Sequence, residues 1–151
     1  MTLSEIFYPG AIIPDLAGTT KEAVFSELVD VIVAAHPDCD RTELLASLWK
    51  REEKQSTGIA SGIAIPHVVC NEIYSVVGVL GISKKGNDYD SLDKKPVHVI
   101  FMLAAGESAK ENHLNILNQI FSLAVHTDAL ALIQNAENAQ DIHAILSRFG
   151  K

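Results

Sequence analysis

The spacing of apolar residues predicts a first long helix within residues 19–37. Thr19 and Glu22 have the spacing of a capping box, in which two side chains each bond a free backbone N–H at the start of a helix. The helix should end before Pro37, because proline pushes the preceding residue out of the α region. The positions that share its apolar face are Val24, Leu28, Val31, Ile32 and Ala35.

A second helix is predicted over residues 41–54, with Asp40 as its N-terminal cap. Leu44, Leu48 and Arg51 recur at helical spacing and therefore share one face. Arg51 is thus expected on, or at the edge of, the stripe that points toward the core.

A third helix is predicted over residues 108–126, where Ser108 and Glu111 again have capping-box spacing. His113 lies in its first turn and is expected on the side that faces the core. The rest of that apolar face comprises Leu117, Ile120, Phe121 and Ala124.

Two shorter helices are expected to follow, over residues 128–135 and 139–149. Asn138 is the predicted cap of the last helix, and Gly150 is its C-terminal stop.

Three short apolar runs predict strands at residues 63–65, 75–82 and 97–103. The last two are apolar almost throughout, which is typical of a sheet covered on both faces. Between them, the polar and turn-rich residues 84–95 predict a surface loop or a hairpin connection. Together with the helices, this order predicts a single α/β domain over residues 1–151, with three layers and a mixed β-sheet flanked by helices on both faces.

Composition narrows the class of protein. The chain has 151 residues, of which 48% are apolar and 21% are charged, as in a globular domain with a sizeable core. Its formal net charge of −7 argues against nucleic acid or an anionic membrane surface as the main partner. No run approaches the roughly 18 apolar residues that span a bilayer, and the N-terminus lacks the pattern of a signal peptide.

The two cysteines, Cys39 and Cys70, form neither a disulfide framework nor a zinc motif. We therefore expect a protein of the reducing cytoplasm, without insertion into a membrane and without a metal. Motifs for other chemistry are also missing from the sequence, which contains no P-loop, no GxGxxG and no HExxH. The remaining histidines carry little signal: His36, His98, His126 and His143.

Candidate chemistry is concentrated in residues 56–67, STGIASGIAIPH. Pro66 fixes its own φ and biases Ile65 toward extended geometry, so the ring of His67 should leave the end of a strand in a defined direction. A neutral imidazole there can serve as a nucleophile or a base. The alternative is a structural histidine that is hydrogen-bonded at a turn.

The other candidate residues also have two interpretations each. His113 could be a satisfied core residue, or it could donate a hydrogen bond to an anion at the start of its helix. Arg51 could interact with the C-terminal end of its own helix, or its guanidinium could meet a phosphate in fork geometry. Ser56 and Thr57 could be plain loop residues, or they could supply hydroxyl and backbone donors to the same anion.

Residues 51–67, REEKQSTGIASGIAIPH, and residues 111–117, ENHLNIL, resemble the type-2 enzyme IIA of the bacterial phosphoenolpyruvate:sugar phosphotransferase system. This is the fructose/mannitol class, which also includes the nitrogen-regulatory enzyme IIA. The resemblance covers nearly the whole chain, and it implies a mixed sheet sandwiched by helices.

The resemblance also implies a role for each candidate residue. His67 matches the histidine that accepts a phosphoryl group from the phosphocarrier protein HPr and becomes a tele-phosphohistidine. His113 matches a second active-site histidine, which orients the first or stabilises the phosphoryl oxygens, and Arg51 matches an arginine near the site. Ser56 and Thr57 are expected to bind the phosphate, and no cofactor is required.

Two functions remain open within this resemblance. One is a relay component that passes the phosphoryl group to a IIB component for sugar uptake. The other is a nitrogen-type regulator that binds and controls target proteins according to its phosphorylation state. Residues 67–73 match neither subgroup clearly, and Ala60 stands where the family usually has glycine. A third, unrelated class is a metal-independent hydrolase that uses His67 and His113 as base and acid.

Overall fold

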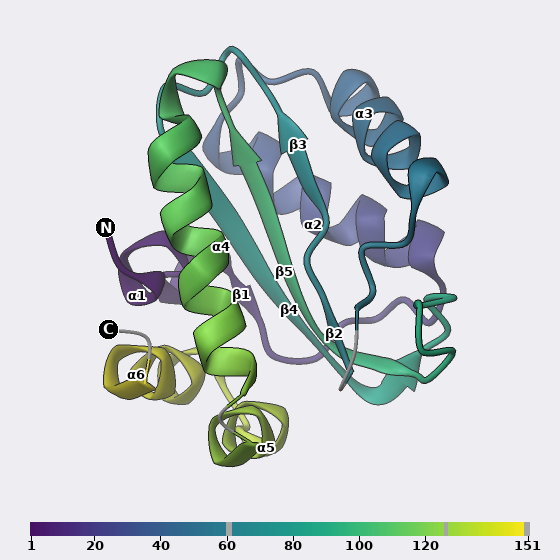
Figure 1. The fold of residues 1–151 in the computed structure, drawn as a ribbon, viewed down its shortest axis with the longest axis vertical. Helices are drawn as coiled ribbons and strands as arrows, with labels where there is room; N and C mark the ends of the chain where they lie inside the picture. Colours follow the sequence, from purple (N-terminus) through teal and green to yellow (C-terminus); the bar gives the residue numbers. More distant parts are fainter. Residues whose placement is uncertain (60–61, 126, 150–151) are drawn as a thin grey trace.

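The computed structural model describes residues 1–59, 62–125 and 127–149. These residues form three layers, in which a mixed sheet is covered by helices on both faces (Figure 1), so the predicted fold class is confirmed. In chain order the elements are α1 (Leu3–Ile6), η1 (Pro9–Ala11), β1 (Ile12–Ile13), α2 (Lys21–Ala35), α3 (Arg41–Lys54), β2 (Ile63–Ala64), β3 (His67–Val69), β4 (Val76–Asn87), β5 (Val97–Ala105), η2 (Glu107–Ala109), α4 (Lys110–Ala124), α5 (Thr127–Asn135) and α6 (Ala139–Phe149).

The sheet is built around β4 and β5, which pair antiparallel. β1 runs parallel to β4 on one side, while β2 and β3 both run parallel to β5 on the other. Ile63 lies opposite Val99 and His67 lies opposite Leu103, so β2 and β3 follow one another along the same edge of β5. The break between them falls at Pro66, whose carbonyl accepts a hydrogen bond of 2.9 Å from the N–H of Leu103.

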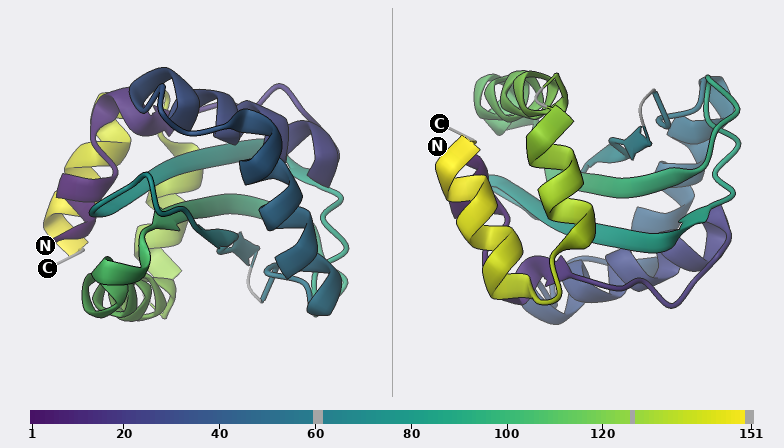
Figure 2. Two further views of the ribbon diagram at one scale, coloured as in Figure 1. Left: turned by 90° about the horizontal axis from the view of Figure 1, so that it is seen from above. Right: turned by 90° about the horizontal axis from the view of Figure 1, so that it is seen from below.

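Two hydrophobic clusters fill the spaces between the layers. Alternate residues of β5 point to opposite faces, so Phe101 and Leu103 join one cluster while Ile100 and Met102 join the other. α2 and α3 cover the face of Ile100, and α4, α5 and α6 cover the face of Phe101. Figure 2 shows the helices on the two faces with the sheet between them. Burial of both faces explains why the strand sequences are apolar almost throughout.

The caps of α2 and α3 explain where these helices begin. The N–H of Ala23 donates to Oγ1 of Thr20, at 3.2 Å, so the cap of α2 is one residue later than the predicted Thr19. The N–H of Glu43 donates to Oδ1 of Asp40, at 3.1 Å, which confirms the predicted cap of α3. As expected from Pro37, α2 ends at Ala35.

The start of α4 differs from the prediction. A short 3₁₀ turn, η2, leads directly into the helix, and its N-cap residue is Ala109, which makes no side-chain capping bond. The predicted cap Ser108 therefore lies inside this turn. The buried face of α4 consists of Ile116, Ile120 and Leu123, whereas Phe121, expected in the core, is 47% exposed.

The last helix follows the sequence prediction closely. The N–H of Asp141 donates to Oδ1 of Asn138, at 2.9 Å, so the predicted cap is confirmed. The predicted stop at Gly150, and also His126, lie outside the described residues. No single helix among the described residues is both long and apolar enough to cross a bilayer, although α4 with its preceding turn and α5 meet that test when they are counted together.

Candidate functional site

His67 begins β3, directly after the break in the sheet edge at Pro66. Its Nδ1 lies 3.0 Å from the carbonyl oxygen of Ile65. A carbonyl oxygen can only accept, so this bond requires the proton of the neutral ring to be on Nδ1. The ring is half-buried, and Nε2 is left with its lone pair. The local backbone therefore fixes both the direction of the ring and which nitrogen can react.

His113 approaches His67 from the first turn of α4. The two ring centroids are 5.6 Å apart and the ring planes meet at 73°. Burial lowers the pKa of His113 from its ordinary value of 6.5, and the charge of nearby His67 lowers it further. Its Nε2 is buried and has no hydrogen-bond partner among the described residues. The site thus holds a neutral ring whose Nε2 can gain a partner when an anion arrives.

α3 packs against β3 (Figure 1). A basic hollow lies where these two elements meet, next to His67. Its cations are Lys50, Arg51 and Lys54, all from the last turns of α3. None of the residues that line the hollow is acidic, although the chain as a whole carries a formal charge of −7. Local positive charge beside a reactive imidazole favours an anionic substrate group.

Arg51 bonds the end of its own helix and also faces the basic hollow. Its Nη1 donates to the carbonyl oxygen of Gln55, at 2.7 Å, and so satisfies the C-terminal end of its own helix. The same side chain lines the basic hollow together with His67. A guanidinium has five donors, so one bond to a carbonyl leaves others for an anion.

The loop before β2 is tied down by a carboxylate that sequence analysis did not single out. Glu52 is only 6% exposed, and its oxygens accept bonds from the N–H and the hydroxyl of Thr57 at 2.7–2.9 Å. Nζ of Lys21 lies 3.7 Å from the same carboxylate and 4.8 Å from the ring centroid of Tyr89. The hydroxyl of Tyr89 is 2.8 Å from Oγ1 of Thr57. Burial, and then the charge of Glu52, raises the pKa of Tyr89, so this phenol stays neutral.

These contacts correct the picture of Thr57 as an anion donor. The residue is 3% exposed, and both of its donors are already engaged by Glu52. Thr57 therefore holds the loop in place and has no donor left for an anion. Ser56 is half-buried, and its Oγ accepts a bond of 3.1 Å from the N–H of Gly58. Its hydroxyl proton remains available.

The signal that could have revealed Glu52 was present in the sequence. Glu52 follows Leu44 and Leu48 at four-residue intervals, so it occupies a core position of α3. A charged residue at such a position needs polar partners. Neighbouring Arg51, expected on or at the edge of that stripe, is half-buried.

Two glycines of the motif occupy positions that do not suit a residue with a side chain. At Gly58 an added Cβ would lie 2.7 Å from Cβ of Ser91 and 2.9 Å from the ring of Tyr89. Gly62 has a φ of 79°, in the left-handed region that side chains disfavour. Ala60 and Ser61, between them, lie outside the described residues.

The other described histidines are held in structural contacts or lie elsewhere. Nδ1 of His98 bonds the carbonyl of Ser83 at 2.9 Å, and Nε2 of His143 bonds the carbonyl of Ser4 at 2.9 Å. Within the described part of the chain, no three His, Cys, Asp or Glu residues gather as metal ligands.

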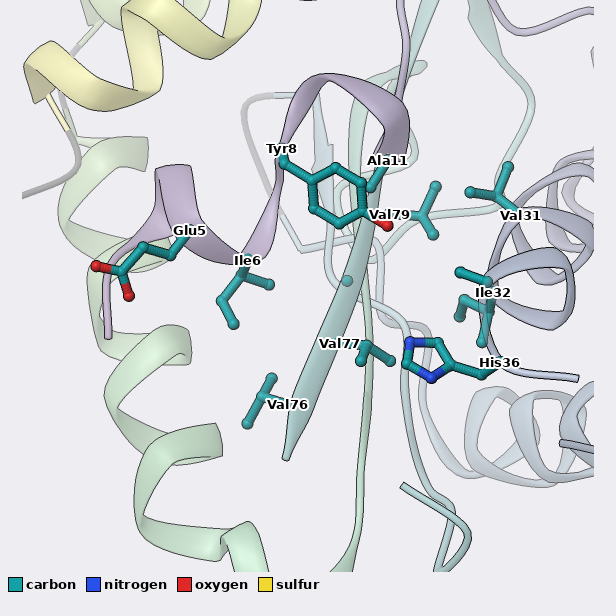
Figure 3. Close-up of a pocket in the computed structure, with 12 residues that line it drawn as sticks. Glu5, Ile6, Tyr8, Ala11, Val31, Ile32, His36, Val76, Val77 and Val79 are labelled. Atoms are coloured by element: carbon teal, nitrogen blue, oxygen red, sulfur yellow. The ribbon is translucent and has the colours of Figure 1, made fainter. Parts of the chain in front are cut away.

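Figure 3 shows a separate hollow beside β4. Its lining includes Tyr8, His36 and three valines of β4, namely Val76, Val77 and Val79. β5 separates β4 from β3, so the hollow and the two facing histidines are distinct places in the fold.

Comparison with known proteins gives concordant matches. The family model described as "Phosphoenolpyruvate-dependent sugar phosphotransferase system, EIIA 2" matches residues 5–149. The fructose-specific EIIABC component of Bacillus subtilis is 33% identical over all of this chain, which spans 24% of that relative's length. A nitrogen regulatory protein of Pseudomonas aeruginosa is 29% identical over 95% of this chain and 94% of its own.

Solved structures show the same fold. The nitrogen regulatory protein IIA-Ntr from Neisseria meningitidis superposes with a TM-score of 0.88 at 25% identity, over 95% of this chain and 98% of its own. The complex of mannitol enzyme IIA with phosphorylated mannitol enzyme IIB from Escherichia coli matches with a TM-score of 0.78 at 13% identity, over 92% of this chain and 95% of the other.

Proposed function

The chain belongs to the type-2 EIIA family of the phosphoenolpyruvate-dependent sugar phosphotransferase system, and we propose that it accepts a phosphoryl group on Nε2 of His67. EIIA components of this family are phosphotransferases that relay a phosphoryl group through a phosphohistidine and pass it to IIB partners. The proposed donor is the phosphohistidine of HPr.

The observation that carries this proposal is the 3.0 Å bond between Nδ1 of His67 and the carbonyl of Ile65. It leaves Nε2 unprotonated, which a nitrogen must be to attack phosphorus. It also persists after transfer, since Nδ1–H still donates while the phosphorylated ring carries positive charge. The carbonyl dipole then stabilises that charge.

In the proposed step, the lone pair of Nε2 forms a bond to phosphorus as the donor's nitrogen–phosphorus bond breaks. The donor imidazole leaves as a neutral ring, and no proton needs to enter or leave His67. Catalysis then depends on in-line positioning and on stabilising the equatorial oxygens. Both donor and acceptor are protein side chains, so a shallow, half-buried histidine suits the reaction.

The basic hollow and His113 are proposed to stabilise the transferred group. Arg51 offers its free guanidinium donors, with Lys50 and Lys54 beside it. His113 is proposed to carry its proton on Nε2, so that this unpartnered atom donates to a phosphoryl oxygen. The hydroxyl of Ser56 is a further proposed donor, while Thr57 acts by holding the loop.

The relatives suggest two roles for the phosphorylated chain. We propose onward transfer to a cysteine or histidine of a IIB component for sugar uptake, in the cytoplasm and without nucleic acid, cofactor or membrane insertion. The match to nitrogen regulatory proteins, over 95% of this chain, supports one alternative role, in which phosphorylation changes which target proteins the chain binds.

Transfer of ³²P from phosphoenolpyruvate through enzyme I and HPr tests this proposal. We expect labelling of the wild type, loss of labelling in His67→Ala and normal labelling in the matched control His98→Gln. Circular dichroism should show that both variants are folded. Labelled His67→Ala would refute the site. Chase with candidate IIB proteins then separates transport from regulation, since only a transport component should pass its label on.

A further inference from the structure

Cys39 and Cys70 are 31 residues apart in the sequence and meet in the fold. Cys39 directly precedes the cap of α3, and Cys70 directly follows β3. Their Sγ atoms are 3.6 Å apart, and the two residues are 4% and 8% exposed. The two free thiols are therefore already in contact, at the ends of the two elements that line the basic hollow.

The hydrogen bonds around the pair give the two thiols different roles. Cys70 donates its S–H to Oε2 of Glu72, at 3.2 Å. Since that bond uses the proton of Cys70, the contact between the sulfurs is a bond that Cys39 donates to Cys70. Cys70 also lines a surface hollow with Asp40, Glu43 and Glu72, whereas Cys39 does not. Cys70 is thus the thiol that a small solute reaches first.

We infer that a small neutral hydroperoxide oxidises Cys70, that Cys39 then closes a reversible disulfide with it, and that this cross-link slows phosphoryl acceptance at His67. The acidic lining of the hollow disfavours anionic oxidants such as glutathione disulfide. The effect on acceptance rests on the proposed function, whereas formation of the disulfide does not.

The chemistry balances in two steps. The thiolate of Cys70 attacks one oxygen of hydrogen peroxide, the O–O bond breaks, and the products are a sulfenic acid and one water. The sulfur of Cys39 then attacks Sγ of Cys70, and the sulfenic oxygen leaves as a second water with the proton of Cys39. Two thiols and one peroxide thus give one disulfide and two waters. The proton that Cys70 releases combines with the departing hydroxide to complete the first water.

The cross-link should disturb the site because a disulfide is shorter than the present contact. A sulfur–sulfur bond measures about 2.05 Å, so the two sulfur atoms must approach by about 1.5 Å, and this pulls on the elements that carry them. The N–H of Cys70 bonds the carbonyl of Ala105 at 2.9 Å, and His67 stands three positions earlier on the same edge of the sheet. A misplacement of about 1 Å can slow an in-line transfer up to about a hundredfold. We expect acceptance to slow about tenfold or more.

The protonation of Cys70 makes the oxidation slow at neutral pH. Burial, the bond to Glu72 and the neighbouring Cys39 together raise the pKa of Cys70 to about 12. Below that value the thiolate fraction, and hence the oxidation rate, should rise about tenfold per pH unit. Asp40 and Glu43 face the same hollow and add to the negative charge around the thiol. Glu72→Gln removes one cause of the raised pKa, so it should oxidise faster than the wild type.

The test treats the reduced full chain with hydrogen peroxide and then measures mass, peptide map and acceptance from phospho-HPr. We expect a mass loss of two hydrogen atoms, a peptide that joins Cys39 to Cys70, slowed acceptance, and recovery of both properties with dithiothreitol. Cys39→Ser and Cys70→Ser should show neither the cross-link nor the reversible slowing.

Several outcomes would overturn the inference. Persistent free thiols, a sulfinic acid at Cys70 beside a free Cys39, or a disulfide between two chains would each refute the internal cross-link. A cross-link with unchanged acceptance would refute the regulatory effect. If the reduced protein accepts no phosphoryl group, the proposed function fails, while mass and peptide map still decide the disulfide.

Discussion

His67 and His113 lie edge to face, with their ring centroids 5.6 Å apart. His67 belongs to the edge strand β3, whereas His113 belongs to α4, a helix that covers one face of the sheet. The ring of His67 is hydrogen-bonded through Nδ1 to the carbonyl of Ile65. The ring of His113 has a buried Nε2 with no hydrogen-bond partner among the described residues. One nitrogen is therefore free to attack, and a second is available to meet the charge of the group that arrives.

Replacement of His113 should slow the transfer and leave acceptance possible. His113→Ala removes a preorganised donor, and loss of one such donor in an active site costs about a hundredfold in rate. His113→Gln retains an N–H donor and should lose less. Rapid-quench measurement of labelling from phospho-HPr gives both rates. Equal, wild-type rates in the two variants would show that His113 only fills space.

The lowered pKa of His113 predicts how stability depends on pH. The unfolded chain takes up the proton near pH 6.5, while the folded protein takes it up only at lower pH. Between these values the unfolded state binds more protons, so stability rises with pH there. The full contribution is present above 6.5 and is lost as pH falls through the folded pKa.

Urea unfolding across this range checks that sign. The free energy of unfolding of the wild type should fall more steeply below pH 6.5 than that of His113→Gln. Parallel curves for the two proteins would mean that His113 titrates alike in the folded and unfolded states.

Arg51 should contribute more to transfer than to folding. Arg51→Ala loses one exposed bond to a helix carbonyl, which costs no more than about 1 kcal/mol, but it also removes the planar donor of the basic hollow. We expect acceptance to fall about tenfold, with incomplete recovery in Arg51→Lys. Lys94→Ala, an exposed cation paired with Asp90, is the matched control. Full recovery by lysine would argue for simple charge attraction.

Glu52 should be essential for the loop before β2. Glu52→Gln turns an amide group toward donors of Thr57, so we expect the free energy of unfolding to fall by about 1–3 kcal/mol. Phosphoryl acceptance should fall as well, because the loop leads into β2, and β2 is followed by the strand of His67. The neighbouring exposed Glu53→Gln should change stability by less than about 0.5 kcal/mol. Similar urea midpoints for the two variants would contradict this role.

Local signals made much of the fold predictable. Asp40 and Asn138 cap their helices as expected, because capping depends on residues within one turn. Thr19 and Thr20 carry the same side chain, so either could cap α2, and the path of the chain into the helix selects Thr20. The N-terminal elements were missed because α1 and β1 are too short for periodicity, and they are held by burial of residues such as Leu3 and Phe7.

The candidate site was predictable only in part for a similar reason. A motif can single out His67 and His113, but their ring-to-ring contact depends on how α4 packs over the sheet. Thr57 illustrates the opposite case. Its hydroxyl could serve as a donor to an anion as far as the sequence shows, but in the fold it donates to Glu52. The contact between Cys39 and Cys70 has no local signal at all, because it joins residues on separate elements.

The central claim is that Nε2 of His67 receives the phosphoryl group, and NMR of the phosphorylated protein with ¹⁵N-labelled histidine tests it most directly. The account predicts phosphorus coupling to Nε2 of His67 alone, with a proton retained on Nδ1. Phosphorus on Nδ1, or on any other histidine, would contradict it.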